Sequence, residues 1–385
     1  MAGYLFNLDN ENSLINYIQN GIYSTKLSAP NGIWKTHHEA TFADYVTMKS
    51  GDNVYFFIKR KIYGIGELVK IKIDCKYCNY PNSSEPINYD YNDIKLDLLW
   101  DEGNYSANQR WICLFKPSPF FFKTGIDMDN VLASNPNAFK MLRAFWKVSF
   151  IKFDDLENQA FKDVILKFNK KSLNDLNSDS TFHASNFKYK HREILNKKNL
   201  NDYSLDIKPI LRACADGSFI RHEMAIEAGI LSQLTTKDET TIQVFGDWDY
   251  LSHQVIASPF KPIDYIDKMD VFGYSYITGY SPTRSRYLVI EIKKDKANAQ
   301  DIEQLMKYVG WVKDEYCYGD YSMIESYLVA YEFEKNILDY RDKVALRKYT
   351  LGRRPAISGE WKNLKIIKYF FDNQHERLQF DIVKK

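Results

Sequence analysis

Cysteine is scarce in this sequence, and long apolar runs are missing from it. Five cysteines scattered over 385 residues are too few, and odd in number, for a disulfide framework, so we expect reduced thiols. No stretch approaches the ~20 apolar residues that a membrane-spanning helix needs. The first residues also lack the basic and then apolar pattern of a secretory signal. We therefore expect a cytoplasmic protein without a membrane partner.

An excess of one charge is missing as well. The 52 Lys and Arg residues nearly balance the 50 Asp and Glu residues, which leaves a net charge of +2. No overall electrostatic field therefore indicates a nucleic-acid partner, and any surface that binds one must be local. Aromatic residues are abundant instead, at 15%, and most of them are expected to fill cores.

The length and the hydrophobic content of 45% predict two domains with ordinary cores. Residues 1–168 are rich in aromatic and strand-like patterns, which predicts an α+β domain with many strands. Residues 169–204 are rich in Lys, Asn, Ser and Asp and are predicted to form a polar linker. Residues 205–385 alternate helix and strand patterns, as is typical of an α/β core with a mixed sheet.

Periodicity and capping signals also predict individual elements. The expected helices are 13–20, 137–145, 154–169, 221–234, 298–315 and a later one that ends near 349. The expected strands of the C-terminal part are 241–245, 268–272, 286–293, 324–333, 364–371 and 378–383.

The strand expected at 286–293 ends in two charged residues, Glu291 and Lys293. Because side chains alternate between the two faces of a strand, this pair shares one face. Asp270 closes another short strand, and a hairpin through the loop at 279–284 would bring it beside Glu291. Two carboxylates with waters and a substrate phosphate supply the hard oxygen ligands of Mg²⁺, which lowers the pKa of a bound water. Lys293 would orient that water and balance charge in the transition state.

The trio of Asp270, Glu291 and Lys293 resembles the PD-(D/E)xK nuclease superfamily, although Met269 stands where that family often has proline. An isolated Glu-x-Lys is most often an exposed strand end, and the ensemble of strands, spacing and following helix is what favours the nuclease interpretation.

Gln304 and Tyr308 follow on the next expected helix, four residues apart and therefore on one helical face. This arrangement looks like the branch that contains NucS-type, RecB-type and Shedu-type nucleases. The resemblance implies a restriction-endonuclease-like core in which Asp270, Glu291, Lys293 and Gln304 are catalytic.

A further acid often comes from the helix before the first strand in such enzymes. Glu223 and Glu227 lie four apart on one face of that helix, and Glu227, in the more apolar setting, is preferred as the third metal ligand. A surface salt bridge is the alternative for either residue. The implied cofactor is Mg²⁺, with Mn²⁺ able to replace it. The implied partners are double-stranded DNA or DNA ends, together with further copies of the chain in a dimer or tetramer.

Residues 48–57 and 62–69 resemble the Gly-Asp turn and the Gly-rich strand of PUA-like folds such as the EVE and YTH groups. Such barrels often hold a nucleobase in an aromatic pocket, which Trp34, Phe57 or Trp111 could supply, with core packing as the alternative for each ring. Tyr308 is a further candidate for contact with DNA. We expect a PUA-like β-barrel domain that senses DNA.

Together these resemblances imply a metal-dependent DNA endonuclease under control of its N-terminal domain. The Shedu-like features suggest a role in antiphage defence. One alternative is a restriction endonuclease for modified DNA. Another is a protein of nuclease fold that only binds DNA, which the presence of Asp270, Glu291 and Lys293 disfavours.

Overall fold

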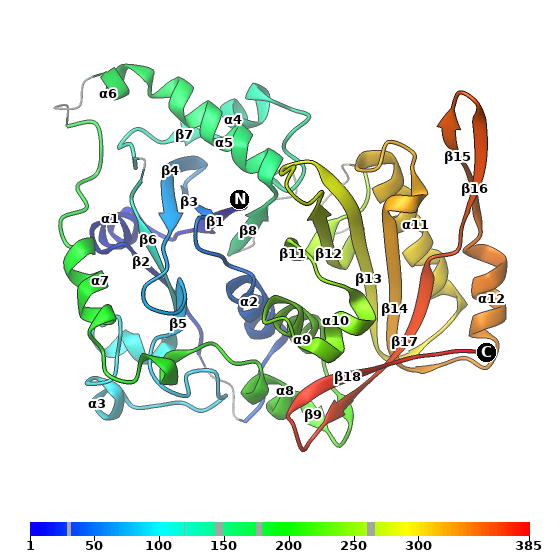
Figure 1. The fold of residues 1–385 in the computed structure, drawn as a ribbon. Helices are drawn as coiled ribbons and strands as arrows, with labels where there is room; N and C mark the ends of the chain where they lie inside the picture. Colours follow the sequence, from blue (N-terminus) through cyan, green and yellow to red (C-terminus); the bar gives the residue numbers. More distant parts are fainter. Residues whose placement is uncertain (29–31, 119, 143–148, 175–178, 260–265) are drawn as a thin grey trace. The chain divides into compact units, whose positions relative to one another are not determined.

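The computed structural model describes residues 1–385 except 29–31, 119, 143–148, 175–178 and 260–265 (Figure 1). The chain divides into an N-terminal unit, Met1–Asp206, and a C-terminal unit, Ile207–Lys385. Among the described residues, no helix is both long enough and apolar enough to cross a membrane.

The N-terminal unit is a mixed α+β structure around a curled mixed sheet. The six strands of its main path run in the order β2-β6-β4-β3-β1-β8; β5 pairs with β6, and β7 with β4. Strands β1 and β3 are parallel, and the other pairs are antiparallel. The strands are β1 (Gly3–Asn7), β2 (Ile22–Lys26), β3 (Asn53–Ile58), β4 (Lys61–Leu68), β5 (Lys76–Cys78), β6 (Gln109–Lys116), β7 (Ile126–Asp127) and β8 (Phe150–Phe153).

Several helices of this unit begin after a residue whose side chain accepts a hydrogen bond from the backbone of the first turn. The first, α1, begins after Asn10, whose side chain accepts a hydrogen bond from the Ser13 backbone, and ends at Gly21 in the left-handed conformation. The α-helices are α1 (Glu11–Asn20), α2 (Thr36–Val46), α3 (Tyr91–Ile94), α4 (Met128–Ser134), α5 (Asp155–Phe168), α6 (Lys170–Asn174) and α7 (Phe187–Leu195). The helices predicted at 13–20 and 154–169 are confirmed. The one predicted at 137–145 is not found at 137–142, and its last residues lie outside the described part of the chain.

Residues 169–204 are not a bare polar linker. They contain α6, α7 and a short 3₁₀ helix, Leu200–Tyr203, and they belong to the N-terminal unit. Ile194 and Leu200 are buried, and the His191 ring contacts the Gly21 carbonyl through Nε2 at 2.9 Å. A few well-spaced apolar side chains therefore anchor a segment whose overall composition is polar.

The C-terminal unit is built on one six-stranded mixed sheet in the order β11-β12-β13-β14-β17-β18. Strands β13, β14 and β17 are parallel, and the flanking pairs are antiparallel. The strands of this sheet are β11 (Tyr250–Ile256), β12 (Lys268–Tyr276), β13 (Arg284–Ala297), β14 (Ile324–Phe333), β17 (Leu364–Asp372) and β18 (Arg377–Ile382). Two small ribbons are formed by β9 (Ala215–Asp216) with β10 (Phe219–Ile220), and by β15 (Arg347–Arg353) with β16 (Ala356–Trp361).

Helices pack on this sheet through apolar faces. The buried residues of α11 include Ile302, Leu305 and Val309, and the helix contacts β13 and β14. The helices are α8 (Lys208–Cys214), α9 (Glu223–Thr235), α10 (Glu239–Phe245), α11 (Ala299–Glu315) and α12 (Ile337–Val344).

Most predicted elements of the C-terminal unit are confirmed, and two predictions are wrong. Residues 241–245 form the end of α10 and not a strand, because Asp238 caps a helix there and accepts a hydrogen bond from the Thr241 backbone at 2.9 Å. The helix predicted to reach 349 ends at Val344, and β15 begins at Arg347.

Candidate active site

The antiparallel pairing of β12 with β13 positions the first two candidate residues. Val271 lies opposite Ile290 in this ladder, so the next step along both strands sets Asp270 across from Glu291. The backbone nitrogen of Ile292 donates a hydrogen bond to Asp270 Oδ2 at 2.7 Å. The predicted hairpin is therefore confirmed, and it brings the aspartate to the strand that bears the Glu-x-Lys pair.

Glu291 and Lys293 form an ion pair on β13. Lys293 Nζ lies 2.6 Å from Glu291 Oε1 and 4.0 Å from Asp301 Oδ1. Asp301 also accepts a hydrogen bond from the Asn298 backbone in the capping box of α11, so the lysine lies where the strand and the helix meet. Glu291 is only 1% exposed, and its Oε2 has no hydrogen-bond partner among the described residues. A buried oxygen of this kind is costly unless a ligand engages it.

Helix α9 brings a third carboxylate to the same place. Glu227 is 2% exposed, and Gln254 Nε2 lies 3.0 and 3.2 Å from its two oxygens. The same nitrogen lies 3.4 Å from Asp270 Oδ1, so one amide links the two acids. Glu223 instead accepts a hydrogen bond from the Lys294 backbone at 3.2 Å. Of the two glutamates, Glu227 is the one that shares a contact with Asp270.

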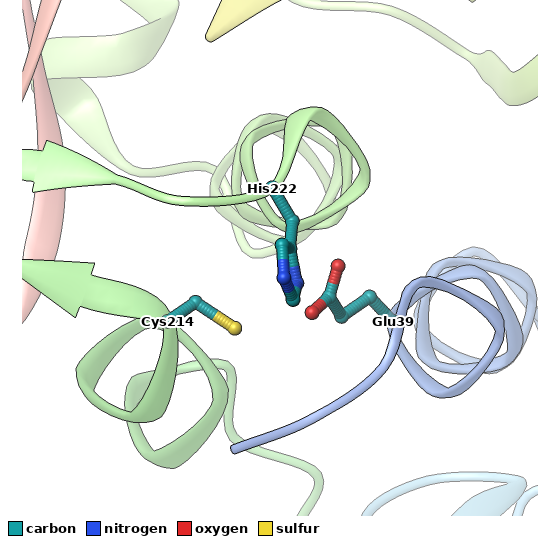
Figure 2. Close-up of side chains that lie close together, drawn as sticks. All are labelled: Glu39, Cys214 and His222. Carbon is teal, nitrogen blue, oxygen red and sulfur yellow. The ribbon is translucent and has the colours of Figure 1, made fainter.

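The start of α9 is fixed by the short connection from α8. Cys214 ends α8, the β9-β10 ribbon follows, and the Arg221 backbone returns to donate a hydrogen bond to the Cys214 carbonyl at 2.9 Å. His222 then takes the N-cap position of α9. Figure 2 shows the side chains of Cys214 and His222, which lie before and after the β9-β10 ribbon. Glu39, also labelled in that view, belongs to α2 of the N-terminal unit. This short connection sets the helical position from which Glu227 projects.

Helix α11 contributes a polar pair to the surroundings of the carboxylates. Gln304 Nε2 donates a hydrogen bond to the Tyr308 hydroxyl at 2.7 Å, as the spacing of four residues allows. Burial raises the pKa of Tyr308 to about 12, and the charges of Glu291 and Asp270 add to this effect. The hydroxyl therefore lies within electrostatic reach of both acids.

The three carboxylates share an environment that disfavours negative charge. Burial raises the pKa of Glu291 to about 7, even though Lys293 opposes this shift. Burial also raises the pKa of Asp270 well above its usual range, and Glu227 and Glu291 raise it further. The pKa of Glu227 is raised, again chiefly by burial. Burial works against the charge of Lys293, but the nearby acids, Glu291 first among them, together outweigh it and raise the pKa of the lysine. One lysine does not offset three acids, so the cluster can accept a further cation.

Two residues of this cluster were not predicted from the sequence, because both lie on β11, a strand that was not predicted either. Gln254 is one of them, and His253 Nδ1 lies 3.6 Å from Glu227 Oε2. Neighbours on a regular strand point to opposite faces. Both reach Glu227 here because Gln254 has a φ of 52°, which departs from the strand conformation. No residue type or pattern in the sequence 250–256 predicts such a change of backbone direction.

The aromatic candidates of the N-terminal unit lie in a different setting. Trp34 and Trp111 are 1% and 0% exposed, and their rings lie 6.1 Å apart. Trp111 Nε1 donates a hydrogen bond to Ser84 Oγ at 3.2 Å. Phe57 is half-buried and packs against the core that contains Tyr55. The two tryptophans act as core residues and present no exposed face to a base.

No protein-family model matches this chain, and no curated protein matches it. Among solved structures, the chain is similar to the complex of EndoMS with double-stranded DNA, at 25% identity over 20% of this chain and 27% of that one, with a TM-score of 0.15. A repair endonuclease from Pyrococcus abyssi is 22% identical over 34% of this chain and 47% of that one, with a TM-score of 0.21. A protein from Pseudomonas putida is 13% identical over 42% of this chain and 98% of that one, with a TM-score of 0.25. The chain thus spans less than half of the first two structures, and the TM-scores do not define a shared fold.

Proposed function

We propose that the C-terminal unit is a metal-dependent endonuclease that hydrolyses phosphodiester bonds in DNA. The observation that carries this proposal is the meeting of Glu227, Asp270 and Glu291 with Lys293 at one place on the sheet. Three buried acids with a single lysine do not stabilise the fold by packing, since a buried charge destabilises a fold unless it is paired.

The donor set fits Mg²⁺. Carboxylate oxygens are the ligands that this hard ion prefers, and Glu291 Oε2 is buried without a partner among the described residues. Asp270, Glu291 and Glu227 would hold the ion, and Mn²⁺ would replace it. When bound, such an ion lowers the pKa of a water and offsets charge on a phosphate.

The other side chains of the cluster have roles of their own. The Lys293 ammonium lies beside Glu291, where it would donate hydrogen bonds to the scissile phosphate and to the attacking water. Its raised pKa keeps it protonated, which suits a role as a cation better than one as a base. Gln304 and Tyr308 support each other and would orient the groups next to the acids.

The choice of DNA as substrate is supported by the resemblance of Asp270, Glu291 and Lys293 to the PD-(D/E)xK motif. Two of the similar solved structures, a complex of EndoMS with double-stranded DNA and a repair endonuclease, accord with this choice. A role in antiphage defence, a PUA-like sensing function for the N-terminal unit and assembly into a dimer or tetramer are parts of the same proposal.

A cleavage assay with the full-length chain tests this function. Supercoiled plasmid, blunt linear DNA and DNA with overhangs are incubated with Mg²⁺, with Mn²⁺ or with EDTA. We expect cleavage with either ion and none with EDTA. Equal cleavage in EDTA would contradict metal dependence, and no cleavage of any DNA form with either ion would contradict the proposed activity.

A further inference from the structure

Gln254 occupies the space between two of the three acids. Its Nε2 lies within hydrogen-bond distance of both oxygens of Glu227, at 3.0 and 3.2 Å, and 3.4 Å from Asp270 Oδ1. A single NH₂ group thus faces three carboxylate oxygens. This NH₂ group carries only the partial positive charge of a neutral amide. The carboxylates of Glu227 and Asp270 would favour a full positive charge at this position.

Five of the six carboxylate oxygens of Glu227, Asp270 and Glu291 have a hydrogen-bond partner, and Gln254 is the partner of three of them. Gln254 engages both Glu227 oxygens and Asp270 Oδ1, the Ile292 backbone engages Asp270 Oδ2, and Lys293 engages Glu291 Oε1. Only Glu291 Oε2 has no partner among the described residues. Gln254 engages both oxygens of Glu227, so a cation that binds all three acids competes with its amide for at least one of them.

The backbone of Gln254 is held in an unusual conformation for this contact. Its φ of 52° lies in the left-handed region, which is costly for a residue with a side chain, and it occurs inside β11. Gln254 is half-buried as a residue, so part of it is open to solvent. An amide that is well placed on a half-buried residue is suited to temporary occupation of a site.

We propose that Gln254 is a displaceable substitute for the metal ion: its amide binds Glu227 and Asp270 in the metal-free protein and gives way when a divalent cation binds. The residue stabilises the metal-free site and weakens the apparent affinity for the metal. This inference rests on the proposed function, since it assumes that the acids bind a divalent ion.

The test is Mn²⁺ binding to the full-length protein, measured by isothermal titration calorimetry after removal of metal with EDTA. Gln254→Gly removes the amide and tolerates the left-handed backbone, and Gln254→Met removes the hydrogen bonds but keeps the length of the side chain. Tyr318→Gly is the matched control, because Tyr318 has the same φ of 52° and is 96% exposed. Glu291→Gln reports whether the binding occurs at this site.

Both Gln254 variants should bind Mn²⁺ about fivefold more tightly than the wild type, as expected when one competing hydrogen-bond donor is removed. Tyr318→Gly should bind as the wild type does. In EDTA, Gln254→Gly should melt at a lower temperature than Tyr318→Gly, a readout that needs no metal.

Weaker Mn²⁺ binding in both Gln254 variants would show that the residue is a metal ligand. Unchanged Mn²⁺ binding would show that its amide does not affect the metal site. Either result overturns the inference but leaves the proposed function intact. A wild type that binds no Mn²⁺, or binds it equally well as Glu291→Gln, would overturn the metal site and the inference with it.

Discussion

Asp270 Oδ2 accepts a hydrogen bond of 2.7 Å from the backbone nitrogen of Ile292, the residue between Glu291 and Lys293. This bond fixes the aspartate to the strand that bears the other two candidate residues. It also leaves Asp270 Oδ1 facing Gln254, next to Glu227. The arrangement makes the acids and the lysine one unit.

Gln304→Ala should lower the rate of DNA cleavage by about 10- to 100-fold, less than the loss of a metal ligand, because Gln304 bonds Tyr308 and orients its surroundings. Tyr308→Phe, which removes the same hydrogen bond from the other side, should have an effect of similar size. Single-turnover rates measure both. A loss in Gln304→Ala as complete as in Glu291→Gln would place Gln304 on the metal or on the substrate.

Glu227→Gln should weaken Mn²⁺ binding by about tenfold or more, whereas Glu223→Gln should change it by less than about threefold. The difference follows from their contacts, since Glu227 is joined to Asp270 through Gln254 and Glu223 accepts from the Lys294 backbone. Titration calorimetry compares the two variants. The reverse order would assign the third ligand to Glu223.

Metal binding should release more protons at pH 6 than at pH 8.5. Burial raises the pKa of Glu291 to about 7, so at pH 6 this carboxyl carries a proton that the metal must displace, and at pH 8.5 it does not. The affinity for Mn²⁺ should therefore increase with pH across this range. Calorimetry in buffers of different ionisation enthalpy counts the protons, and a constant count would contradict the raised pKa.

The same shift has a consequence for the metal-free protein. The unfolded chain titrates Glu291 near the ordinary value of about 4.5. Between that value and about 7 the folded protein binds more protons than the unfolded chain, so this residue makes the free energy of unfolding fall as pH rises through the window. Thermal melts in EDTA should show a lower melting temperature at pH 7 than at pH 5.5 in the wild type, and a smaller difference in Glu291→Gln.

Removal of the N-terminal unit should change when or where the nuclease cuts. We expect residues 205–385 to cleave blunt, overhanging and base-modified duplexes with a selectivity different from that of the full chain. The comparison needs equal protein concentrations and a check that the shorter chain is folded, for instance by circular dichroism. Identical rates and preferences in both would make the N-terminal unit a scaffold.

The sequence was sufficient to predict the centre of the candidate site. Strong apolar runs define β12 and β13, and strand alternation then places Glu291 and Lys293 on one face. The hairpin loop is short enough that pairing with Asp270 follows directly. The helix with Gln304 and Tyr308 has a clear apolar stripe and a capping box, so it could also be predicted.

What the sequence did not reveal depends on long-range packing. The contact between Gln254 and the acids requires β11, a strand with no clear alternation, and a left-handed residue within it. The β-branched residues of 241–245 favour a strand locally, but the Asp238 cap stabilises a helix there. The burial of Trp34 and Trp111 likewise depends on neighbours far away in the sequence, which no local pattern specifies.

The most direct test of the central claim is DNA cleavage by Lys293→Ala, with Lys294→Ala as its matched control. Lys294 is the next residue along β13, and its side chain is 44% exposed and pairs with Asp295 at 3.6 Å. Both variants should fold, with circular dichroism spectra close to that of the wild type, although loss of the ion pair with the buried Glu291 should lower the melting temperature of Lys293→Ala. In Mg²⁺ we expect Lys293→Ala to lose about 100-fold or more in single-turnover rate and Lys294→Ala to keep the wild-type rate. Wild-type cleavage by a folded Lys293→Ala protein would contradict the assignment of this site.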